Sequence, residues 1–277
     1  MASENEAMKI DVDMVLRTRA AKYYRFIPGF LIRWLEKTIC QEEMNGILSR
    51  NAGKDGVDFC RAALSDLGVS YTVDGTLPDD GRKVVIVSNH PLGGLDGLVL
   101  ADMVSRAYGD KRDVRFVVND LLNFVRPLNS IFLGVNKHGA QSRDASKRLE
   151  GAFASDAQIL MFPAGLVSRK GDDGEIADLR WHKMVIQKAI SSRRDIIPLY
   201  FNGVNSQFFY KFARLRTRLG IKFNIEMIYL PREIFRRDDR SFHITIGDPI
   251  SWTSLKGGTH AQHEADRLRE IVYNLKK

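Results

Sequence analysis

The sequence places a histidine and an aspartate where they could carry out proton transfer. His90 closely follows an apolar, β-branched run, Val84–Ser88, and the turn Gly93-Gly94 separates it from Asp96. A histidine can accept or release a proton near neutral pH, and a neighbouring carboxylate can fix its tautomer and ring orientation. The pair therefore predicts a general base, His90, that is held by Asp96. The alternative is a structural histidine beside an aspartate that stabilises a helix N-terminus.

The spacing of this pair restricts how the two side chains can meet. His90 and Asp96 are six residues apart, about 240° around an ideal helix, so they cannot share one helical face. They can meet if His90 lies in the loop that precedes a helix and Asp96 lies in its first turn. Gly93 and Gly94 make such a loop possible, because glycine tolerates left-handed conformations and close backbone approach.

A second candidate site follows another apolar run (ILMF) and has the sequence FPAGLVSRK at residues 162–170. It turns at Pro163 and Gly165 and then presents Ser168 and Arg169. Small residues followed by a hydroxyl and two cations predict a site for an anion or a polar headgroup, formed by backbone N–H groups and Arg169. The alternative is a surface loop with solvated charges.

Two weaker patterns also place polar residues just beyond apolar runs. Lys137 follows Ile131–Val135, and Asn202–Asn205 follows an apolar run that contains Pro198. Parallel strands end at one edge of their sheet, which is where α/β proteins bind ligands. We therefore expect the polar side chains that follow these runs to converge on one site.

From Tyr71 onward, strand-like and helix-like patterns alternate, which predicts an α/β fold with a mixed, largely parallel sheet flanked by helices. Residues 222–241 are ambiguous between strand and helix, and a capping box of Thr259 and Gln262 is expected at the start of the last helix. The expected strands are Tyr71–Val73, Val84–Ser88, Val114–Val118, Ile131–Val135, Ile159–Phe162, Ile196–Phe201 and Phe242–Ile246. The expected helices are Leu95–Tyr108, Arg143–Phe153, Arg180–Ser191, Ser206–Leu219 and His260–Leu275.

Residues 1–67 are expected to form an N-terminal helical, amphipathic segment, followed by an α/β domain at 68–277. Between Met14 and Lys37, six basic residues and one acidic residue leave an excess of +5 charges. With about 100° per residue, most of the charged residues fall on one arc and most of the apolar and aromatic residues on the opposite arc, and Pro28-Gly29 must kink or split the helix. This pattern is typical of a helix that lies in a membrane interface. An amphipathic helix packed on its own domain is the alternative.

Composition narrows the partners and the compartment. The 277-residue chain has a net charge of +8 and a pI of about 9.5, which favours an anionic partner: nucleic acid, an anionic membrane surface or an acidic substrate. Its apolar stretches are far shorter than the ~20 residues of a spanning helix, and its N-terminus lacks an apolar signal core. We therefore expect a cytoplasmic protein with peripheral membrane contact. Cys40 and Cys60 have neither metal-ligand spacing nor the pattern of a disulfide framework.

This sequence lacks the motifs of several other protein classes. It contains no nucleotide-binding glycine loop and no serine nucleophile elbow of the α/β-hydrolases. His260 and His263 lack the order of a zinc-protease motif and are expected at a solvated helix start. The basic residues accompany an aromatic helix and strand ends rather than a nucleic-acid-binding module, so no nucleic-acid partner is expected.

In their order along the chain, these motifs resemble the glycerolipid acyltransferase superfamily, whose best-known members acylate lysophosphatidic acid. The resemblance spans roughly residues 80–205, and SNHPLGGLDG with FPAGLVSRK looks like the hemolysin-related branch of bacterial lyso-lipid acyltransferases. That branch includes Bacteroidetes-type enzymes that complete glycine or ornithine lipids. The resemblance implies that His90 removes the proton of the acceptor hydroxyl as it attacks a fatty-acyl thioester, with Asp96 holding His90. It also implies a set of substrate-binding residues: Asn89, Gly93, Gly94, Lys137, Pro163, Gly165, Ser168 and Arg169.

Two departures from the superfamily pattern bear on the acceptor. The usual spacing has four residues between histidine and aspartate, whereas here there are five, an insertion that the two glycines can absorb. The third block is usually FPEGTRS, but here Ala164 replaces the glutamate and Val167 replaces the arginine. The loss of this pair argues against a phosphate-monoester acceptor and fits a carboxylate-bearing lyso-amino-acid lipid. The cations that could pair with such a carboxylate are Lys137, Arg169 and Lys170.

We therefore predict a peripheral membrane O-acyltransferase at the cytoplasmic face of the inner membrane. It would move a fatty acyl group from acyl carrier protein (acyl-ACP) or coenzyme A (acyl-CoA) to the hydroxyl of a lyso-lipid, in glycine or ornithine lipid synthesis. The thioester is a co-substrate, and neither a bound cofactor nor a metal is implied. Two alternatives stay open: a 1-acylglycerol-3-phosphate acyltransferase of phospholipid synthesis, and a non-catalytic membrane-binding protein.

Overall fold

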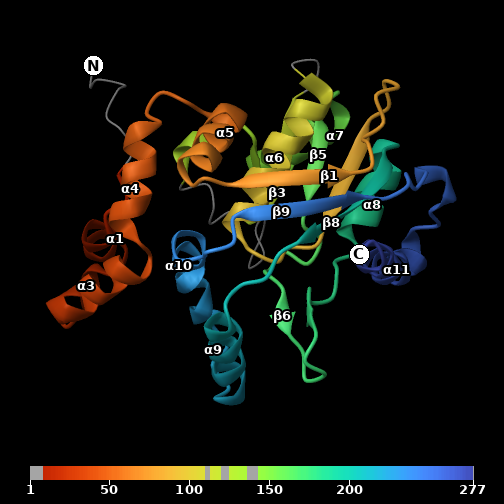
Figure 1. Cartoon of the computed structure of the whole chain (residues 1–277). Helices are drawn as coiled ribbons and strands as arrows, with labels where there is room; N and C mark the ends of the chain where they lie inside the picture. Colours follow the sequence, from red (N-terminus) through yellow and green to blue (C-terminus); the bar gives the residue numbers. More distant parts are fainter. Residues whose placement is uncertain (1–8, 110–112, 120–124, 136–142, 277) are drawn as a thin grey trace.

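A seven-stranded sheet forms the centre of the molecule (Figure 1). The structure is a computed structural model that describes residues 9–109, 113–119, 125–135 and 143–276. The strand order is β1-β9-β8-β2-β5-β3-β4, and each of the seven expected strands is confirmed. Their bounds are β1 (Ser70–Asp74), β2 (Val84–Ser88), β3 (Val114–Asn119), β4 (Phe132–Val135), β5 (Gln158–Met161), β8 (Asp195–Asn202) and β9 (Ser241–Ile246).

Five of these strands run in one direction, which brings their carboxyl ends to the same edge of the sheet. β2 pairs in parallel with β5 and with β8, and β3 pairs in parallel with β5 and with β4. β9 runs antiparallel to β8 and parallel to β1, so these two strands run the other way. The predicted mixed, largely parallel sheet is therefore confirmed, and the segments that follow β2, β5 and β8 leave the sheet side by side.

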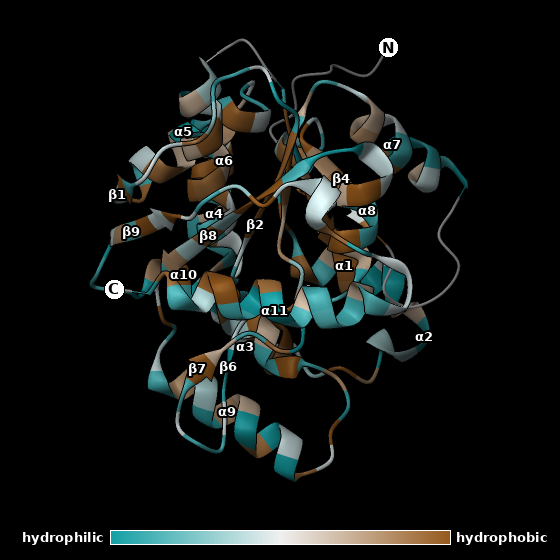
Figure 2. Ribbon diagram, turned by 90° about the vertical axis from the view of Figure 1, so that its right-hand side faces the viewer, coloured by the Kyte–Doolittle hydropathy of each residue, from teal (hydrophilic) through white to brown (hydrophobic). Residues whose placement is uncertain are grey.

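Helices cover both faces of the sheet because its central strands are apolar on both sides. Along β2, Val84 and Ile86 belong to a hydrophobic core shared with α5 and α6, whereas Val85 and Val87 belong to a second core shared with α7, α8 and α11. Figure 2 shows α5 and α6 on one side of the hydrophobic strands and α7 and α8 on the other. The helices are α5 (Gly56–Asp66), α6 (Gly94–Tyr108), α7 (Arg143–Ala154), α8 (Met184–Ser192) and α11 (Ala261–Asn274).

The expected helices are all present, and their N-terminal ends lie within one residue of the prediction except for that of α8. α8 begins at Met184 rather than at Arg180, because the His182 N–H donates to the Pro163 carbonyl oxygen at 3.0 Å and holds the preceding residues in a loop.

The expected capping box of Thr259 and Gln262 is wrong. α11 follows a short 3₁₀ helix, Gly258–His260, and its N-cap makes no side-chain capping hydrogen bond. Gln262 Nε2 instead donates to the Trp181 carbonyl oxygen at 2.8 Å. This contact ties α11 to the loop before α8.

The segment that is ambiguous in sequence, residues 222–241, contains a 3₁₀ helix and a short α-helix. η4 (Ile225–Tyr229) leads directly into α10 (Leu230–Phe235), and β9 begins at Ser241. Pro231 lies in the first turn of α10, where the missing proline N–H costs no helical hydrogen bond. Two short helices of different type give no single periodicity, which explains the ambiguity.

The N-terminal residues are helical, as predicted, and the chain breaks at Pro28, the N-cap of α3. α4 and α5 contribute Leu48, Phe59 and Leu64 to the core beside α6, whereas α1 to α3 lie at one end of the molecule (Figure 1). None of the described helices has the length and apolar character needed to cross a bilayer. A domain boundary between residues 67 and 68 stays a prediction. The bounds are α1 (Val12–Arg19), α2 (Ala21–Tyr24), α3 (Gly29–Thr38) and α4 (Gln41–Arg50).

Arg194 is a fully buried cation whose partners are backbone carbonyl groups. It donates to the carbonyl oxygens of Phe153, Ala157 and Ser155 at 3.1, 2.7 and 2.6 Å. Arg194→Met removes these donors and leaves buried carbonyls unpaired, so we expect the free energy of unfolding to fall by about 3 kcal/mol. Urea denaturation followed by circular dichroism measures this loss. Arg148→Met, on the exposed side of α7, should change the value by less than about 0.5 kcal/mol, and equal losses in both variants would contradict the assignment.

Candidate active site

His90 and Asp96 are in contact, as their predicted pairing requires. His90 Nδ1 lies 3.1 Å from Asp96 Oδ2. The Asp96 side chain is fully buried, whereas the His90 side chain keeps 16% of its surface exposed. The tautomer with a proton on Nδ1 donates to Asp96 and leaves the Nε2 lone pair free to accept a proton. The pair therefore has the geometry of a base that is oriented by a carboxylate.

The loop between β2 and α6 makes this contact possible across the extra residue. Gly93 is the N-cap of α6 and has a φ of +89°, a conformation that residues with a side chain disfavour. Asp96 accepts hydrogen bonds from the backbone N–H groups of Leu92, Gly93 and Gly97 at 2.8, 3.3 and 2.8 Å. Asp96 thus stabilises the helix N-terminus and orients His90 at the same time, so the two interpretations of the sequence are compatible.

The pair lies where two neighbouring strands send the chain to opposite faces of the sheet. β2 leads into α6 on one face, and β5 leads towards α8 on the other. Such a topological switch point opens a crevice at the carboxyl ends of the strands. The His90 ring stacks on Phe162, which directly follows β5, with ring centroids 3.9 Å apart and planes inclined by 19°. The motif that contains His90 and the motif FPAGLVSRK at residues 162–170 therefore meet at one site.

Asp178, which the sequence analysis did not single out, joins the loops that carry these motifs. Its Oδ1 accepts from the Ser168 hydroxyl at 2.6 Å and from the His90 N–H at 3.1 Å, and its Oδ2 accepts from Trp181 Nε1 at 3.0 Å. Burial raises the pKa of the Asp178 carboxyl. In addition, the Ser168 N–H donates to the His90 carbonyl oxygen at 2.8 Å. The only signal in the sequence is one aspartate at the end of an acidic loop.

Asn89 and Asn205 hold the His90 loop from the side of β8. Asn89 Oδ1 accepts from the Phe201 N–H at 2.7 Å, and Asn89 Nδ2 donates to the Phe201 carbonyl oxygen at 2.9 Å. Asn205 Nδ2 donates to the Pro91 carbonyl oxygen at 3.0 Å. The Asn89 amide is thus used within the fold, which favours a positioning role over the expected substrate contact.

Pro163 and Gly165 form the turn that the sequence predicts after β5. Gly165 has a φ of +61°, and its N–H donates to the Phe162 carbonyl oxygen at 2.9 Å. This turn directs the chain to Ser168, whose hydroxyl is used by Asp178. The substrate contacts expected of these residues stay predictions, and the hydrogen bonds shown here position the loop.

Arg169 belongs to a buried ion-pair cluster rather than to an open anion site. Glu226 is fully buried and lies 2.6 Å from Arg169 and 3.0 Å from Arg216. Arg169 also donates to the Val167 carbonyl oxygen at 2.7 Å, and burial lowers the pKa of its guanidinium. Glu226, in the ambiguous segment, thus supplies one negative charge for two arginines, and the expected pairing of Arg169 with a substrate anion stays a prediction.

The two altered positions of the third motif are buried among apolar residues. Ala164 belongs to the core that contains Trp181, and Val167 packs with Phe209 and Tyr210. Ala164 is 3% exposed and Val167 is fully buried. Two apolar side chains that pack in the protein interior thus stand where the superfamily usually has a glutamate and an arginine. No charged pair is available at these positions.

α10 covers the glycine loop and connects it to the N-terminal helices. A Cβ atom on Gly93 would lie 2.9 Å from Leu230, and one on Gly94 would lie 3.6 Å from Ile234. Directly before α10, the Tyr229 ring packs edge-on against Trp34 of α3, with centroids 6.4 Å apart. The wall of the site on this side therefore comes from the segment whose structure the sequence did not predict.

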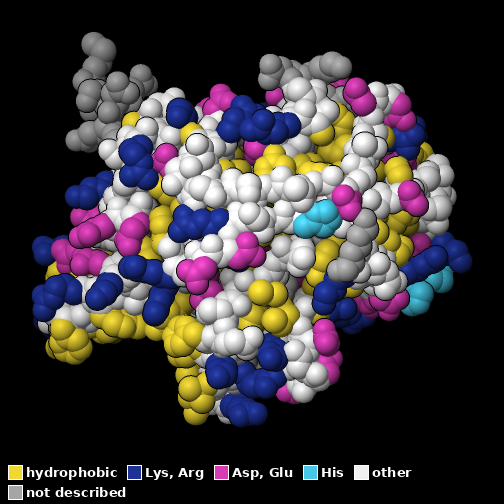
Figure 3. Space-filling view, in the orientation of Figure 1, with side chains coloured by type: hydrophobic (Ala, Val, Ile, Leu, Met, Phe, Trp, Pro, Cys, Tyr) yellow, Lys and Arg dark blue, Asp and Glu magenta, His cyan; other side chains and the backbone are white. Residues whose placement is uncertain are grey.

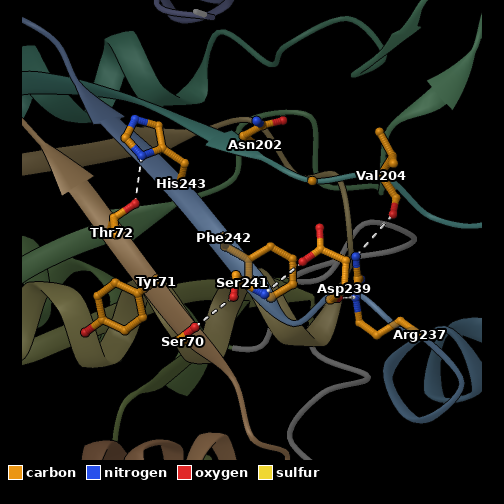
Figure 4. Close-up of a pocket in the computed structure, with 11 residues that line it drawn as sticks. Ser70, Tyr71, Thr72, Asn202, Val204, Arg237, Asp239, Ser241, Phe242 and His243 are labelled. Carbon is orange, nitrogen blue, oxygen red and sulfur yellow. Dashed lines mark hydrogen bonds between the residues drawn. The ribbon is translucent and has the colours of Figure 1, made fainter.

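A polar pocket of about 400 Å³ opens beyond β8 at the same edge of the sheet (Figure 4). Its wall includes the end of β8 and the beginnings of β1 and β9, where His243 Nδ1 lies 2.8 Å from Thr72 Oγ1. Neither member of the catalytic pair is among its eleven lining residues. A Cβ atom on Gly203, at its rim, would lie 3.1 Å from Leu92. The pocket therefore adjoins the His90 loop without containing His90.

Lys137, the remaining predicted substrate-binding residue, lies outside the described residues, which end at Val135 in this part of the chain. Among the residues that the structure describes, no group of three or more His, Cys, Asp and Glu side chains could hold a metal ion. Cys40 and Cys60 are buried and free.

The fold and the site define an α/β enzyme with a histidine–aspartate pair at the edge of the sheet. The chain belongs to the acyltransferase family. The model of that family, described as "Acyltransferase", matches residues 14–277. The chain is 43% identical over 276 residues to the lyso-glycine lipid O-acyltransferase of Bacteroides thetaiotaomicron, covering 99% of this chain and 100% of that protein. It is 42% identical over 276 residues to the protein of the same name from Phocaeicola vulgatus, covering 99% and 97%.

One solved structure with a similar arrangement is the 1-acyl-sn-glycerophosphate (LPA) acyltransferase PlsC from Thermotoga maritima. It has a TM-score of 0.48 and 14% sequence identity and covers 96% of this chain and 92% of that chain. The relatives and the family model together show that this chain is an acyltransferase. The predicted enzyme class and the resemblance to the superfamily are confirmed, and the non-catalytic alternative is set aside.

Gly93 and Gly94 offer a matched test of the loop geometry. Gly93→Ala places a Cβ 2.9 Å from Leu230 at a φ of +89°, so we expect it to displace His90 from Asp96 and to lower turnover at least about tenfold. Gly94→Ala lies in the first helical turn, where its Cβ makes only ordinary contacts, and should keep turnover within about twofold. Steady-state acyltransfer assays measure both. Equal activities in the two variants would show that the left-handed turn is not required.

Asp178 should contribute mainly through its hydrogen bonds to the two loops. Asp178→Asn places an amide N–H₂ where a donor already points, so we expect the free energy of unfolding to fall by about 1–3 kcal/mol. Ser168→Ala removes only one donor and should cost about 1 kcal/mol. Thermal unfolding at constant pH compares the variants. A larger loss in Ser168→Ala than in Asp178→Asn would argue against Asp178 as the centre of this network.

Proposed function

We propose that this enzyme transfers a fatty acyl group from a thioester to the hydroxyl of a lyso-amino-acid lipid, and specifically of a lyso-glycine lipid. The observation that carries the proposal is the His90–Asp96 contact at the switch point of the sheet. The acceptor class is supported by the names of the two relatives, which match almost the whole chain, and by the apolar packing at Ala164 and Val167.

His90 Nε2 accepts the proton of the acceptor hydroxyl while the hydroxyl oxygen attacks the thioester carbonyl carbon. A C–O bond forms, the C–S bond breaks, and the leaving thiolate takes the proton from the imidazolium. Asp96 stabilises the positive charge that develops on the ring. Among the described residues, no hydroxyl or thiol is hydrogen-bonded to the His90 ring, whose partners are Asp96 and the stacked Phe162 ring. The acyl group therefore moves directly from donor to acceptor.

The acceptor headgroup determines which charges the site requires. A phosphate monoester carries up to two negative charges, and the third motif offers no charged pair for it. A glycine headgroup ends in a single carboxylate, which one cation can pair with. With Arg169 bound to Glu226, we assign this role to Lys137 or Lys170.

We propose that the enzyme acts at a membrane surface, because its acceptor is a lipid, and that this surface is the cytoplasmic face of the inner membrane. Support comes from the segment that contains α1 to α3, in which Tyr23, Phe26, Phe30 and Trp34 expose 63%, 69%, 67% and 45% of their surface. Six basic residues between Met14 and Lys37 accompany them, and aromatic and basic side chains together suit an anionic interface. The donor is acyl-ACP or acyl-CoA.

His90→Ala should lower turnover by about 10²- to 10⁴-fold, because it removes the general base. Asp96→Asn should lose less, because it keeps the imidazole base and removes only the carboxylate that orients it. The assay uses a labelled palmitoyl thioester and three acceptors: lysophosphatidic acid, lyso-glycine lipid and lyso-ornithine lipid. Circular dichroism of each variant controls for folding.

Acylation of the glycine acceptor by the wild type, with His90→Ala inactive, is the expected result. Acylation of lysophosphatidic acid alone would overturn the acceptor assignment and keep the base. Near-normal turnover of His90→Ala would overturn the mechanism itself.

A further inference from the structure

α9 (Gln207–Arg218) projects from the body of the protein and has three different faces (Figure 1). One face is buried and contains Phe209, Tyr210 and Ala213. With about 100° per residue, a second face forms a narrow apolar stripe that begins beside Tyr229 and runs to the end of the helix. The stripe consists of Phe208, Phe212, Leu215 and Leu219, and all but Phe212 are at least 46% exposed.

The apolar surface continues past the end of the helix. Leu219, Ile221, Phe223 and Ile225 are 66%, 37%, 81% and 37% exposed. Single exposed apolar residues are common on protein surfaces, but a contiguous set marks an interaction site. The projection therefore ends in a tip, residues 215–225, that water solvates poorly.

Basic residues accompany this tip. Residues 207–224 contain five basic residues and no acidic residue. Arg216 is bound to Glu226 on the inner side, and the third face of the helix carries Lys211, Arg214 and Arg218. Figure 3 shows the hydrophobic side chains along one side of this projection and the lysine and arginine side chains along the other. An apolar edge with a cationic flank is complementary to an anionic lipid surface.

The stripe of α9 is continuous with the exposed aromatic residues of α3. The Phe208 and Phe212 rings each pack edge-on against Tyr229, with centroids 5.0 and 5.3 Å apart, and Tyr229 packs in turn against Trp34. On α3, Phe30 is 67% exposed. Two separate parts of the chain therefore present one apolar surface, and Tyr229, the residue that joins them, directly precedes α10 over the glycine loop.

We propose that the tip of α9, residues 215–225, binds the surface of an anionic lipid bilayer as a second contact in addition to α3. Two contacts from different parts of the chain fix the orientation of the enzyme as well as its attachment, which a single helix does not do. The inference rests on the proposed function only in taking the acceptor to be a membrane lipid. An acidic protein partner is the competing occupant. The bilayer is favoured because the apolar side chains of the tip are themselves exposed, Phe223 by 81% and Leu219 by 66%, and apolar side chains can insert between lipids.

The first test is vesicle binding by the full-length protein. Leu219→Ser with Phe223→Ser should weaken binding to phosphatidylcholine–phosphatidylglycerol vesicles by about tenfold or more, because two inserted apolar side chains are lost. Gln207→Ser with Thr217→Ser changes two exposed polar positions on the same helix and should leave the affinity unchanged. Arg218→Gln with Lys222→Gln should weaken binding to these vesicles but not to pure phosphatidylcholine.

The second test locates the tip in the bilayer. Cys40 and Cys60 are buried, and burial raises the pKa of the Cys60 thiol to about 12, so an introduced cysteine can be labelled selectively. A fluorophore on Phe223→Cys should be quenched by nitroxide-labelled lipids in the vesicle. A fluorophore on Thr253→Cys, which lies beside the start of β8, should not be quenched. Quenching at neither position would overturn the proposal.

Turnover in detergent micelles separates this proposal from the proposed function. Leu219→Ser with Phe223→Ser should keep wild-type turnover on micellar acceptor while it loses vesicle binding. Unchanged vesicle binding would overturn the proposal, as would loss of acyl carrier protein binding with vesicle binding retained. If the wild type acylates none of the acceptors yet binds vesicles through residues 219 and 223, the proposed function fails and the bilayer contact stands.

Discussion

The Asp96 carboxylate is the constraint on which the arrangement of the site depends. It is fully buried and receives three backbone N–H groups at the N-terminus of α6 together with the ring of His90. A buried carboxylate is costly unless its oxygens are paired. These contacts leave the loop few conformations. The one in the structure places the histidine at the end of β2. Helix stability and catalytic geometry are satisfied by the same four contacts.

Much of this arrangement could be predicted from the sequence, because its signals are local. The central strands are short apolar runs that end in polar or glycine residues, so their bounds agree closely with the structure. The His90–Asp96 contact could be predicted because glycine in the loop tolerates a positive φ, and Gly93 adopts one. The turn at Pro163 and Gly165 follows from the same reasoning.

The remaining features depend on partners that are distant in the chain. Asp178 binds the His90 N–H across 88 positions, and Glu226 binds Arg169 across 57 positions. No local pattern distinguishes these two acidic residues from solvated ones. Arg169 looked free for an anion because its partner lies in a segment with no clear periodicity. The capping box failed for a related reason: Gln262 fits the local pattern, but its side-chain amide donates to the carbonyl oxygen of the distant Trp181 instead of accepting at the helix N-terminus.

The stack of Phe162 on His90 has a consequence for fidelity. An acyl thioester can also react with water. A histidine ring that could turn freely would assist this hydrolysis as readily as it assists acyl transfer to a lipid hydroxyl. With one face of the ring packed on Phe162 at 3.9 Å and Nδ1 bound to Asp96, the ring is held in one orientation and the Nε2 lone pair points in one fixed direction. An aromatic ring that takes no part in the chemistry thereby favours a hydroxyl that is held in this direction over freely diffusing water.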